Sequence, residues 1–376
     1  MRILEVCNFS SGTDGVFTRV REEAVRLAER GHEVRIFSSN LIKGKEGAAS
    51  PEERIGKVKI CRFSAKRIGG ESFMKWDFEP AEKEALKFNP QVIIAHSYRH
   101  LHTSWALNFG KKMGARVYLV THAPFGRKDS RSAAGSIAVG LYDYFIGPGR
   151  LKDFDGIIAI TKWEMPYLKK LGLKENEIEY IPNGIPEEFF NLAMQAREEK
   201  KILFLGRVSR IKGLETAIKS LYFIEDKTIK LEIVGPAEED YLKELKEIAW
   251  AFRLHNRIIF TPAIAGIKEK IAKIDSSEVF VLPSKSEGMP QALIEAMARG
   301  KIAVASDNLG NRDIIKDGEN GLLFRVGDEA ECSRKISQAL RMSRAEKRKM
   351  SWNARKSVED FSWKLVIKKI EELICG

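Results

Sequence analysis

Cysteine is scarce in this sequence, and long apolar runs are absent. The four cysteines are scattered along 376 residues, and none has a partner at metal-ligand spacing. No apolar run approaches the roughly 18–20 residues that span a bilayer, and the first residues are too charged for the core of a signal peptide. We therefore expect no disulfide framework, no thiolate metal site and no membrane-spanning helix, and we predict a cytoplasmic protein.

Low-complexity sequence is also missing, and apolar residues make up 44% of the chain, so global disorder is excluded. Lys and Arg number 64 against 52 Asp and Glu, which gives a formal charge of +12. Such an excess attracts nucleic acid, anionic lipid surfaces or phosphorylated substrates, but it does not choose among them. A lysine-rich surface that serves only solubility is an equal alternative.

Short apolar runs separated by helical patterns predict an α/β fold. Residues 3–6 indicate a strand, residues 10–15 a loop with two glycines, residues 17–30 a helix and residues 34–37 a second strand. This order favours a parallel sheet with right-handed crossovers. Further buried strands are expected at residues 92–95, 117–120, 156–160, 201–206, 231–234, 258–260, 279–282 and 302–305.

The strands fall into two series, which predicts two Rossmann-like domains facing a cleft. We place the amino-terminal domain at residues 1–185, a charged linker at 186–200 and the second domain at 201–355, followed by a carboxyl-terminal helix at 356–376 that packs back toward the first domain. In open parallel sheets ligands bind beyond the carboxyl ends of the strands. The chemistry should therefore lie in the loops that follow strands.

The segment from Pro283 to Gly300 follows one such strand and begins a helix. Pro290 suits the first turn of a helix, and the free N–H groups there favour an anion such as a diphosphate. Because a carboxylate would repel phosphate, Glu287 and Glu295 are better suited to accept hydrogen bonds from sugar hydroxyls. The alternative is a helix start capped by its own acidic residue.

A second strand-to-helix loop, Gly206 to Gly213, carries Arg207 and Lys212. A guanidinium binds a diphosphate bidentately, and a nearby ammonium adds a point charge. The alternative is a pair of solvated charges.

At these residues the sequence resembles a known family. The Glu–x7–Glu element at Glu287 and Glu295, the Gly-Arg-x-x-x-x-Lys-Gly element at residues 206–213, and Ile-Pro-Asn-Gly-Ile at residues 181–185 are similar to glycosyltransferase family 4. That family contains retaining nucleotide-sugar transferases with the GT-B fold. The glycines at residues 12 and 15 depart from the adjacent pair common in the family, and Pro186 stands where an acidic residue is often found.

The resemblance implies a role for each matching residue. Arg207 and Lys212 would hold the donor diphosphate, Glu287 would contact the transferred sugar, and Glu295 would bind the ribose. Catalytic roles are implied for His122, Arg207, Lys212 and Glu287. The implied donor-binding residues are Gly12, Gly15, Arg207, Lys212, Glu287, Gly288, Met289, Pro290, Leu293 and Glu295, with Ile264 and Ala265 as a possible base-contacting loop.

Histidines follow two strands of the first domain. His122 ends the strand at residues 117–120, a reasonable active-site position, and in the family a histidine here lies close to the reacting sugar. His96 ends its own strand, and we expect it to face the cleft near the acceptor. A metal site at His96, His100 and His102 is disfavoured, since the spacing is irregular and no carboxylate accompanies it.

The acceptor site is expected in the first domain, at His96, Arg127 and Lys128. Basic residues 127–131 precede an apolar, aromatic segment at residues 137–146, which would suit a lipid-linked acceptor or an anionic membrane surface. The alternative is a core helix with a solvated basic turn.

The implied reaction transfers a sugar from a nucleoside diphosphate sugar, of UDP or GDP type, to a hydroxyl of a carbohydrate or lipid-linked acceptor. No Asp-x-Asp motif is present to hold a divalent ion, so we expect metal independence and no cofactor beyond the nucleotide sugar. One rival is a nucleotide-sugar epimerase of the same architecture. A dehydrogenase is disfavoured because no Gly-x-Gly-x-x-Gly follows the first strand, and a nucleic-acid binder because no recognition module is present.

Overall fold

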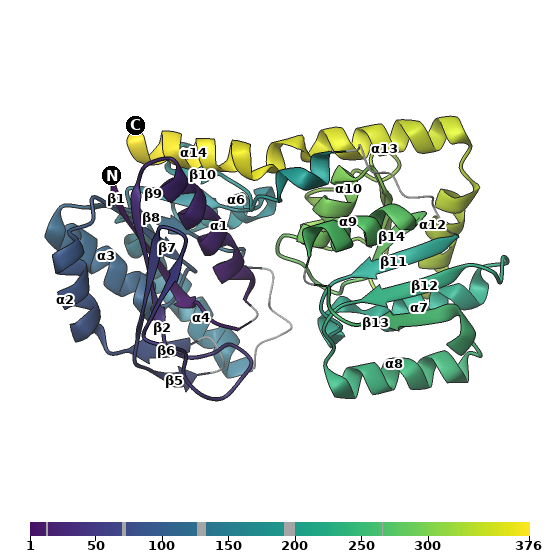
Figure 1. The fold of residues 1–376 in the computed structure, drawn as a ribbon, viewed down its shortest axis with the longest axis horizontal. Coiled ribbons are helices and arrows are strands. Elements are labelled where there is room, and N and C mark those ends of the chain that lie inside the picture. Colours follow the sequence, from purple (N-terminus) through teal and green to yellow (C-terminus); the bar gives the residue numbers. More distant parts are fainter. Residues whose placement is uncertain (13, 70–72, 126–132, 192–199, 265) are drawn as a thin grey trace. The chain divides into compact units, whose positions relative to one another are not determined.

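The chain folds into two compact units. The structure is a computed structural model that describes the 376 residues except residues 13, 70–72, 126–132, 192–199 and 265. One unit comprises Met1–Asn183 and Lys364–Gly376, and the other comprises Gly184–Trp363 (Figure 1). The first unit thus ends two residues before the boundary predicted at residue 185.

The first unit is built on a mostly parallel sheet with the strand order β10-β9-β8-β7-β1-β2-β4-β3, in which only β3 runs antiparallel to its neighbour. All the strands predicted in this half are present. The bounds are β1 Arg2–Phe9, β2 Glu33–Ser39, β3 Glu52–Ile55, β4 Val58–Phe63, β7 Val92–His96, β8 Arg116–Val120, β9 Gly156–Ala159 and β10 Ile178–Tyr180.

Helices cover both faces of this sheet. The crossover from β1 to β2 runs in the opposite direction along the sheet from that between β7 and β8, so right-handed connections put α1 and α3 on opposite faces. α2 packs beside α3, and α14 lies on the side of α1 (Figure 1). The bounds are α1 Gly15–Glu29, α2 Phe78–Phe88, α3 Leu101–Met113, α4 Ala133–Phe145, α5 Gly147–Lys152, α6 Met165–Lys170 and α14 Trp363–Cys375.

A hairpin of β5 (Ala65–Gly69) and β6 (Phe73–Trp76) stands apart from the main sheet and was not predicted. Its anchor is Trp76, which is 2% exposed and stacks on His102 of α3 with ring centroids 5.5 Å apart. His102 also bonds the carbonyl of His96 through Nε2 at 2.7 Å. His102 is therefore a core residue.

The second unit has a wholly parallel sheet in the order β13-β12-β11-β14-β15-β16. Its predicted strands are all present, and the side chains of the inner strands β11, β14 and β15 are almost completely buried, as expected of strands covered on both faces. The bounds are β11 Lys201–Leu205, β12 Lys230–Val234, β13 Ile258–Thr261, β14 Val279–Leu282, β15 Ile302–Ser306 and β16 Leu322–Phe324.

Two groups of helices enclose this sheet. α7 packs on both α8 and α12, and α10 packs on α13; Figure 1 shows α8 on one side of the sheet and α9 and α10 on the other. The bounds are α7 Leu214–Phe223, α8 Glu239–Ala251, α9 Ile267–Ser276, α10 Gln291–Ala298, α11 Leu309–Arg312, α12 Glu329–Arg341 and α13 Arg344–Val358.

The segment predicted as a linker starts inside the second unit. Glu187–Phe190 forms a 3-10 helix, and Phe189 is 1% exposed within the hydrophobic core of that unit. Residues 192–199 lie outside the described residues. After α13 the chain returns to the first unit as α14, whose Leu373 carbonyl accepts a hydrogen bond from the Tyr118 hydroxyl at 3.2 Å.

Each sheet has a switch point, where the order of strands along the chain reverses. In the second unit it lies between β11 and β14, which pair through Ile202 with Val279 and Leu203 with Phe280. In the first unit it lies between β1 and β7. Loops diverge at such points and leave a crevice that binds ligands. The predicted site residues follow β11, β14, β1, β7 and β8.

Candidate functional site

The loops that follow β11 and β14 are in close contact. The amide of Lys285 donates to the carbonyl of Ile211 at 2.8 Å. Gly213 has φ +59°, and a Cβ atom there would lie 2.5 Å from the Pro283 carbonyl oxygen. Only glycine fits both the left-handed backbone and this separation. The two loops predicted to carry the donor site are therefore held together by the backbone itself.

This contact brings together two of the predicted catalytic residues. Lys212 Nζ lies 2.6 Å from Glu287 Oε1, which also accepts a hydrogen bond from Ser284 Oγ at 2.6 Å. The side chains of Lys212 and Glu287 are 23% and 9% exposed. A partly buried ammonium and a nearly buried carboxylate thus meet at the switch point of the second sheet.

Arg207 lies on the same loop, and its side chain is exposed. The loop is fixed at its start, because a Cβ at Gly235 would lie 1.9 Å from the Gly206 carbonyl oxygen. The amide of Val208 also donates to the Pro236 carbonyl at 2.8 Å. Arg207 therefore projects from a loop that is anchored on both sides.

Glu295 lies inside α10, where it is 6% exposed. Its partner is Lys270 of α9, at 2.7 Å from Oε1. Burial raises the pKa of this carboxyl, and the Lys270 charge opposes the rise. The predicted ribose-binding carboxylate is therefore a held, nearly buried acceptor rather than a solvated surface group.

Other predicted donor residues differ in placement. Leu293 is completely buried in the core, and its amide bonds the Pro290 carbonyl at 3.1 Å, so a direct contact from Leu293 to a ligand was wrongly predicted. Gly288 and Met289 are half-buried beside Glu287, and Pro290 is the buried residue that precedes α10. In the possible base loop, Ile264 packs against the core, and Ala265 lies outside the described residues.

The two glycines after β1 have different surroundings. Gly12 has φ +84°, and a Cβ there would lie 2.4 Å from the Lys43 carbonyl oxygen, so a close backbone approach inside the protein already requires glycine. Gly15 begins α1, and a Cβ there would meet nothing within 4 Å. The contact with Lys43 is thus enough to explain a glycine at residue 12, without a donor. Gly15, in contrast, borders open space, as the predicted approach of a donor would require.

His122 sits in a strained loop at the end of β8. Its φ is +59°, and that of Ala123 is +52°, a backbone conformation that residues other than glycine rarely adopt. The loop is held by Glu164, whose carboxylate accepts from Thr121 Oγ1 at 2.5 Å and from the Ala123 amide at 2.8 Å. Strain of this kind persists where the surroundings enforce it and is concentrated at functional sites.

His96 was predicted to face an acceptor, and the structure shows otherwise. Its side chain is completely buried, so it cannot touch a substrate directly. Its Nε2 lies 2.6 Å from Glu5 Oε2, and its Nδ1 lies 2.9 Å from His122 Nε2. His96 therefore connects a carboxylate in the core to the histidine at the strand end, an arrangement the sequence analysis missed.

Charged groups from α1 surround this connection. Arg19 is completely buried and bonds Glu23 Oε2 at 3.1 Å and Asn183 Oδ1 at 3.0 Å. Burial, aided by the charge of Glu5 and opposed by Arg19, raises the pKa of Glu23 to about 7. Glu5 lies in an apolar sequence context, so a carboxylate inside a predicted buried strand was the one available signal.

The predicted acceptor residues Arg127 and Lys128 lie outside the described residues. The apolar segment that follows them forms α4, and its large side chains are exposed, which makes the core-helix alternative wrong. Tyr144 and Phe145 are 77% and 72% exposed, and Ile137 and Leu141 are more than half exposed. The chain therefore presents an aromatic, aliphatic surface on this helix.

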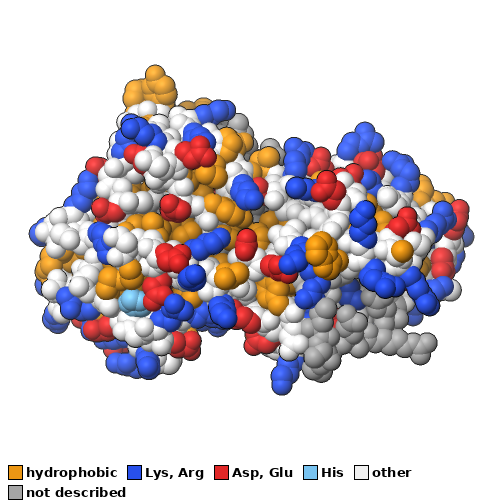
Figure 2. Space-filling view, turned by 90° about the horizontal axis from the view of Figure 1, so that it is seen from above, with side chains coloured by type: hydrophobic (Ala, Val, Ile, Leu, Met, Phe, Trp, Pro, Cys, Tyr) orange, Lys and Arg blue, Asp and Glu red, His pale blue; other side chains and the backbone are white. Residues whose placement is uncertain are grey.

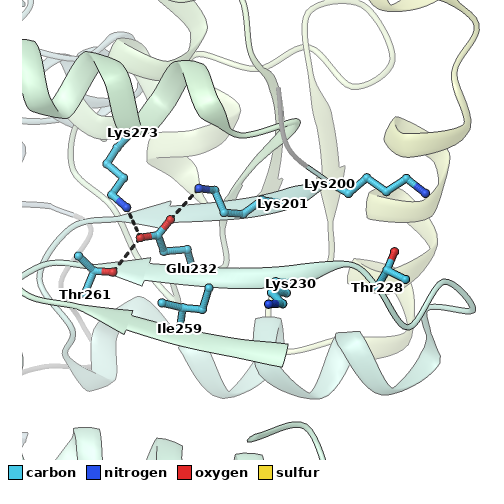
Figure 3. A pocket seen from close by; sticks show the side chains of 8 residues that line it. All are labelled: Lys200, Lys201, Thr228, Lys230, Glu232, Ile259, Thr261 and Lys273. Carbon is cyan, nitrogen blue, oxygen red and sulfur yellow. Dashed lines mark hydrogen bonds and ion pairs between the residues drawn. The ribbon is translucent and has the colours of Figure 1, made fainter. Parts of the chain in front are cut away.

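A cavity of about 650 Å³ lies in the second unit, on the face of β12 and β13 toward α9 (Figure 3). Glu232 is at its centre and is paired with Lys201 at 2.9 Å and Lys273 at 2.5 Å. None of the predicted site residues lines it. The carboxylate of Glu232 is already neutralised by the two lysines, so we do not assign the reaction to this cavity.

The distribution of surface charge, the metal-ligating side chains and the lengths of the helices can be compared with the sequence. On the face in Figure 2, the described Lys and Arg side chains are interspersed with Asp and Glu and form no single basic patch. Within the part of the chain that the structure describes, no group of three or more His, Cys, Asp or Glu side chains could hold a metal ion, and no helix is long and apolar enough to cross a membrane.

Family models match both halves of the chain. Residues 13–189 match "Glycosyltransferase Family 4", and residues 187–357 match "Glycosyl transferases group 1". The chain belongs to the family 4, group 1 glycosyltransferases. The resemblance carried by residues 206–213 and 287–295 is therefore confirmed, and the protein is a glycosyltransferase.

Relatives of this glycosyltransferase cover nearly its whole length. It is 29% identical to an uncharacterized glycosyltransferase of Methanocaldococcus jannaschii, over 96% of this chain and 94% of that protein. It is 26% identical to the phosphatidyl-myo-inositol mannosyltransferase of Mycobacterium leprae, over 98% and 95%.

Solved structures confirm the GT-B fold of the glycosyltransferase. Sucrose-phosphate synthase from Thermosynechococcus elongatus superposes with a TM-score of 0.77 at 18% identity, covering 99% of this chain and 98% of that one. The Anabaena protein HepE, solved with UDP-glucose, superposes with a TM-score of 0.73 at 17% identity, covering 100% and 99%.

Proposed function

We propose that this glycosyltransferase moves a sugar from a nucleoside diphosphate sugar to an acceptor hydroxyl with retention of configuration and without a metal ion. The observation that carries the proposal is the contact of Lys212 with Glu287 at the switch point of the second sheet. An ammonium suits a phosphate, and a carboxylate suits sugar hydroxyls. Their meeting at 2.6 Å supports a donor that would lie with its diphosphate at Lys212 and its sugar at Glu287.

Charge on the leaving diphosphate is the main term that such a site has to stabilise. Lys212, the exposed guanidinium of Arg207 and the start of α10 would supply positive charge and N–H donors to it. Groups fixed in advance toward developing charge are worth several kcal/mol, and the loss of one costs roughly 10²–10³ in rate. The anchored backbone at Gly213 and Gly235 provides this fixation.

The donor class is supported by one solved relative in fold, HepE, whose structures were determined with UDP and with UDP-glucose. Glu295 would bind the ribose hydroxyls. It is a nearly buried hydrogen-bond acceptor in α10, about one helical turn after the start of the helix, where the diphosphate would bind. We propose a UDP or GDP sugar as donor.

A thermal-shift panel of UDP, GDP and ADP sugars tests the donor assignment. At about 100 times Kd, binding adds about 2.7 kcal/mol to the stability of the protein, which raises Tm by about 5–10 °C for a unit of this size. Lys212→Met and Arg207→Met should lose most of this shift. The matched control is Lys347→Met, because Lys347 and Glu278 form a similar half-buried pair, 2.5 Å apart, away from the site.

The thermal shifts of the site variants and of the control decide between the two possibilities for the phosphate site. A shift that Lys347→Met keeps and both site variants lose supports the assignment. Site variants that respond to the sugars as the wild type does would refute the phosphate site.

Retention and metal independence are tested on the product. The anomeric proton of the product, followed by NMR from a donor of known configuration, should keep the donor's configuration, and turnover should survive EDTA. An inverted product or full loss of turnover in EDTA contradicts the proposal. Isomerised nucleotide sugar formed without acceptor would favour the epimerase.

The acceptor is proposed to be lipid-linked or presented at an anionic membrane surface. Support comes from the exposed side chains of α4, since an amphipathic helix that displays aromatic and aliphatic groups buries them at the headgroup boundary. One relative, from Mycobacterium leprae, is named for a phosphatidylinositol acceptor.

Liposome co-sedimentation tests this second proposal. Tyr144→Ser with Phe145→Ser should weaken binding to vesicles containing phosphatidylglycerol roughly tenfold or more, because each buried aromatic contributes about 1.5–3 kcal/mol. Tyr222→Ser with Phe223→Ser is the matched control, an exposed aromatic pair of the second unit, 55% and 51% exposed. Absence of wild-type binding to vesicles with and without anionic lipid would end the proposal.

A further inference from the structure

A continuous hydrogen-bonded chain runs from the core of the first sheet to its carboxyl edge. Glu5 of β1 bonds His96 at the end of β7, and His96 bonds His122 after β8, at 2.6 and 2.9 Å. β1, β7 and β8 are adjacent strands, so the three side chains lie side by side across the sheet. Glu5 and His96 are completely buried, whereas His122 is half-buried.

The surroundings of this chain disfavour a second positive charge. Arg19, completely buried on α1, already lies nearby, and Glu23 bonds it. Burial lowers the pKa of His96 to about 3. Burial, with smaller contributions from the charges of His96, Arg19 and His100, also holds the pKa of His122 well below its usual range. Burial raises the pKa of Glu5, which the charge of Arg19 opposes. Neither histidine is suited to become an imidazolium here.

The geometry allows two neutral-histidine arrangements that differ by one proton. In the first, Glu5 is ionised and accepts from Nε2–H of His96, whose Nδ1 accepts from Nε2–H of His122; Nδ1 of His122 is then an acceptor. In the second, protonated Glu5 donates to Nε2 of His96, whose Nδ1–H donates to Nε2 of His122, and Nδ1 of His122 carries a proton. Nδ1 of His122 has no hydrogen-bond partner among the described residues, so it is the end at which a ligand can bind.

We propose that Glu5 and His96 are positioning residues that fix the ring of His122 and carry one proton between Glu5 and Nδ1 of His122. When Nδ1 takes up a proton, Nε2–H of His122 passes to Nδ1 of His96, and Nε2–H of His96 passes to Oε2 of Glu5. No bond other than N–H and O–H forms or breaks, and no imidazolium remains. His122 can thus accept a hydrogen bond from a substrate hydroxyl or donate one to a substrate oxygen.

This inference rests on the proposed function only in assuming that a substrate binds at His122. The hydrogen bonds between Glu5, His96 and His122 are present without ligand, and the strained backbone at His122 and Ala123 shows that the surroundings enforce this geometry. Glu164, which holds that loop, bonds the backbone beside His122 rather than its ring. The ring orientation therefore depends on His96.

Ring 15N NMR of histidine-labelled protein without donor tests the inference. Lowering the pH should convert His122 from the Nε2–H to the Nδ1–H tautomer while its 15N shifts stay those of a neutral ring. Glu5→Gln should abolish this pH dependence, because a glutamine cannot take up the proton. His96→Gln should abolish it as well, because the hydrogen-bonded path between His122 and Glu5 is then broken. The control is His32→Gln, which removes a histidine paired at 3.1 Å with Glu371 in the same unit.

A wild-type His122 that titrates directly to imidazolium, or one whose tautomer ignores both variants, overturns the inference. The wild-type titration alone decides this point if a variant fails to fold. Turnover gives the second readout: His96→Gln should lower kcat roughly 10- to 100-fold and change its pH profile, with KM for the donor nearly unchanged. Variants that keep the wild-type kcat and pH profile refute a positioning role. A relay seen by NMR in a protein that transfers no sugar would instead refute the proposed function alone.

Discussion

Gly213→Ala should separate the two loops that form the proposed donor site. The added Cβ would lie 2.5 Å from the Pro283 carbonyl oxygen, whereas ordinary contacts begin at 3.4 Å, so the loops must part by the difference of about 0.9 Å. If the shift reaches the side chains, the distance of 2.6 Å between Lys212 and Glu287 grows beyond a good hydrogen bond. A left-handed alanine adds roughly 1–2 kcal/mol, and the crowding adds roughly 1–3 kcal/mol.

The matched control is Gly318→Ala in the same unit. Gly318 also has a positive φ, +79°, but a Cβ there would meet nothing within 4 Å, so this variant carries the backbone cost without the crowding. Urea unfolding should show Gly213→Ala to be the less stable of the two by about 1–3 kcal/mol. Nucleotide-sugar affinity, measured by calorimetry, should fall roughly 10- to 100-fold in Gly213→Ala alone, since a charged hydrogen bond is worth about 1.5–3 kcal/mol. Equal stability and equal affinity for the two variants would refute the argument.

Three further predictions concern buried carboxylates. The pKa of Glu23 is raised from 4.5 to about 7, so its contribution to stability is present below pH 4.5 and is lost as pH rises through 7. The free energy of unfolding of Glu23→Gln, measured in urea, should therefore rise by about 3 kcal/mol relative to that of the wild type between pH 4 and 8. Parallel pH profiles for the two proteins would contradict this. Glu295→Gln, which weakens the acceptor paired with Lys270, should reduce UDP or GDP affinity roughly tenfold by calorimetry, and an unchanged affinity would remove the ribose assignment. Glu164→Gln turns an amide toward donors and should cost about 1–3 kcal/mol in unfolding while shifting the ring signals of His122; a silent NMR spectrum would show that Glu164 does not hold that loop.

Much of the fold could be predicted from local sequence. Strands buried on both faces read as short runs of apolar residues, as in Val279–Leu282, whose bounds were predicted correctly. The resemblance to the family assigned Lys212 and Glu287 to one site although 75 residues separate them. The contact follows from parallel topology, because β11 and β14 are neighbours at a switch point.

The features that were missed depend on contacts between distant residues. Nothing near Glu5 in the sequence says that its carboxylate meets His96, since the pairing of β1 with β7 brings them together. The hairpin of β5 and β6 is short, and it is fixed by Trp76 against α3. Leu293 lies four residues after the predicted sugar contact at Met289, yet the turn of α10 points it into the core.

The two sheets hold their functional loops in physically different ways. In the second unit, glycines at residues 213 and 235 allow backbone to touch backbone, so the loops are fixed by shape and their charged side chains remain available. In the first unit, non-glycine residues adopt positive φ at the end of β8, and the buried carboxylate of Glu164 holds that loop through hydrogen bonds, while the buried carboxylate of Glu5 bonds His96. A carboxylate in the core is costly unless it is bonded. The bonded carboxylates of Glu164 and Glu5 therefore tie the stability of the first unit to the geometry of His122, whereas the second unit fixes the loops of Lys212 and Glu287 through the backbone contact at Gly213.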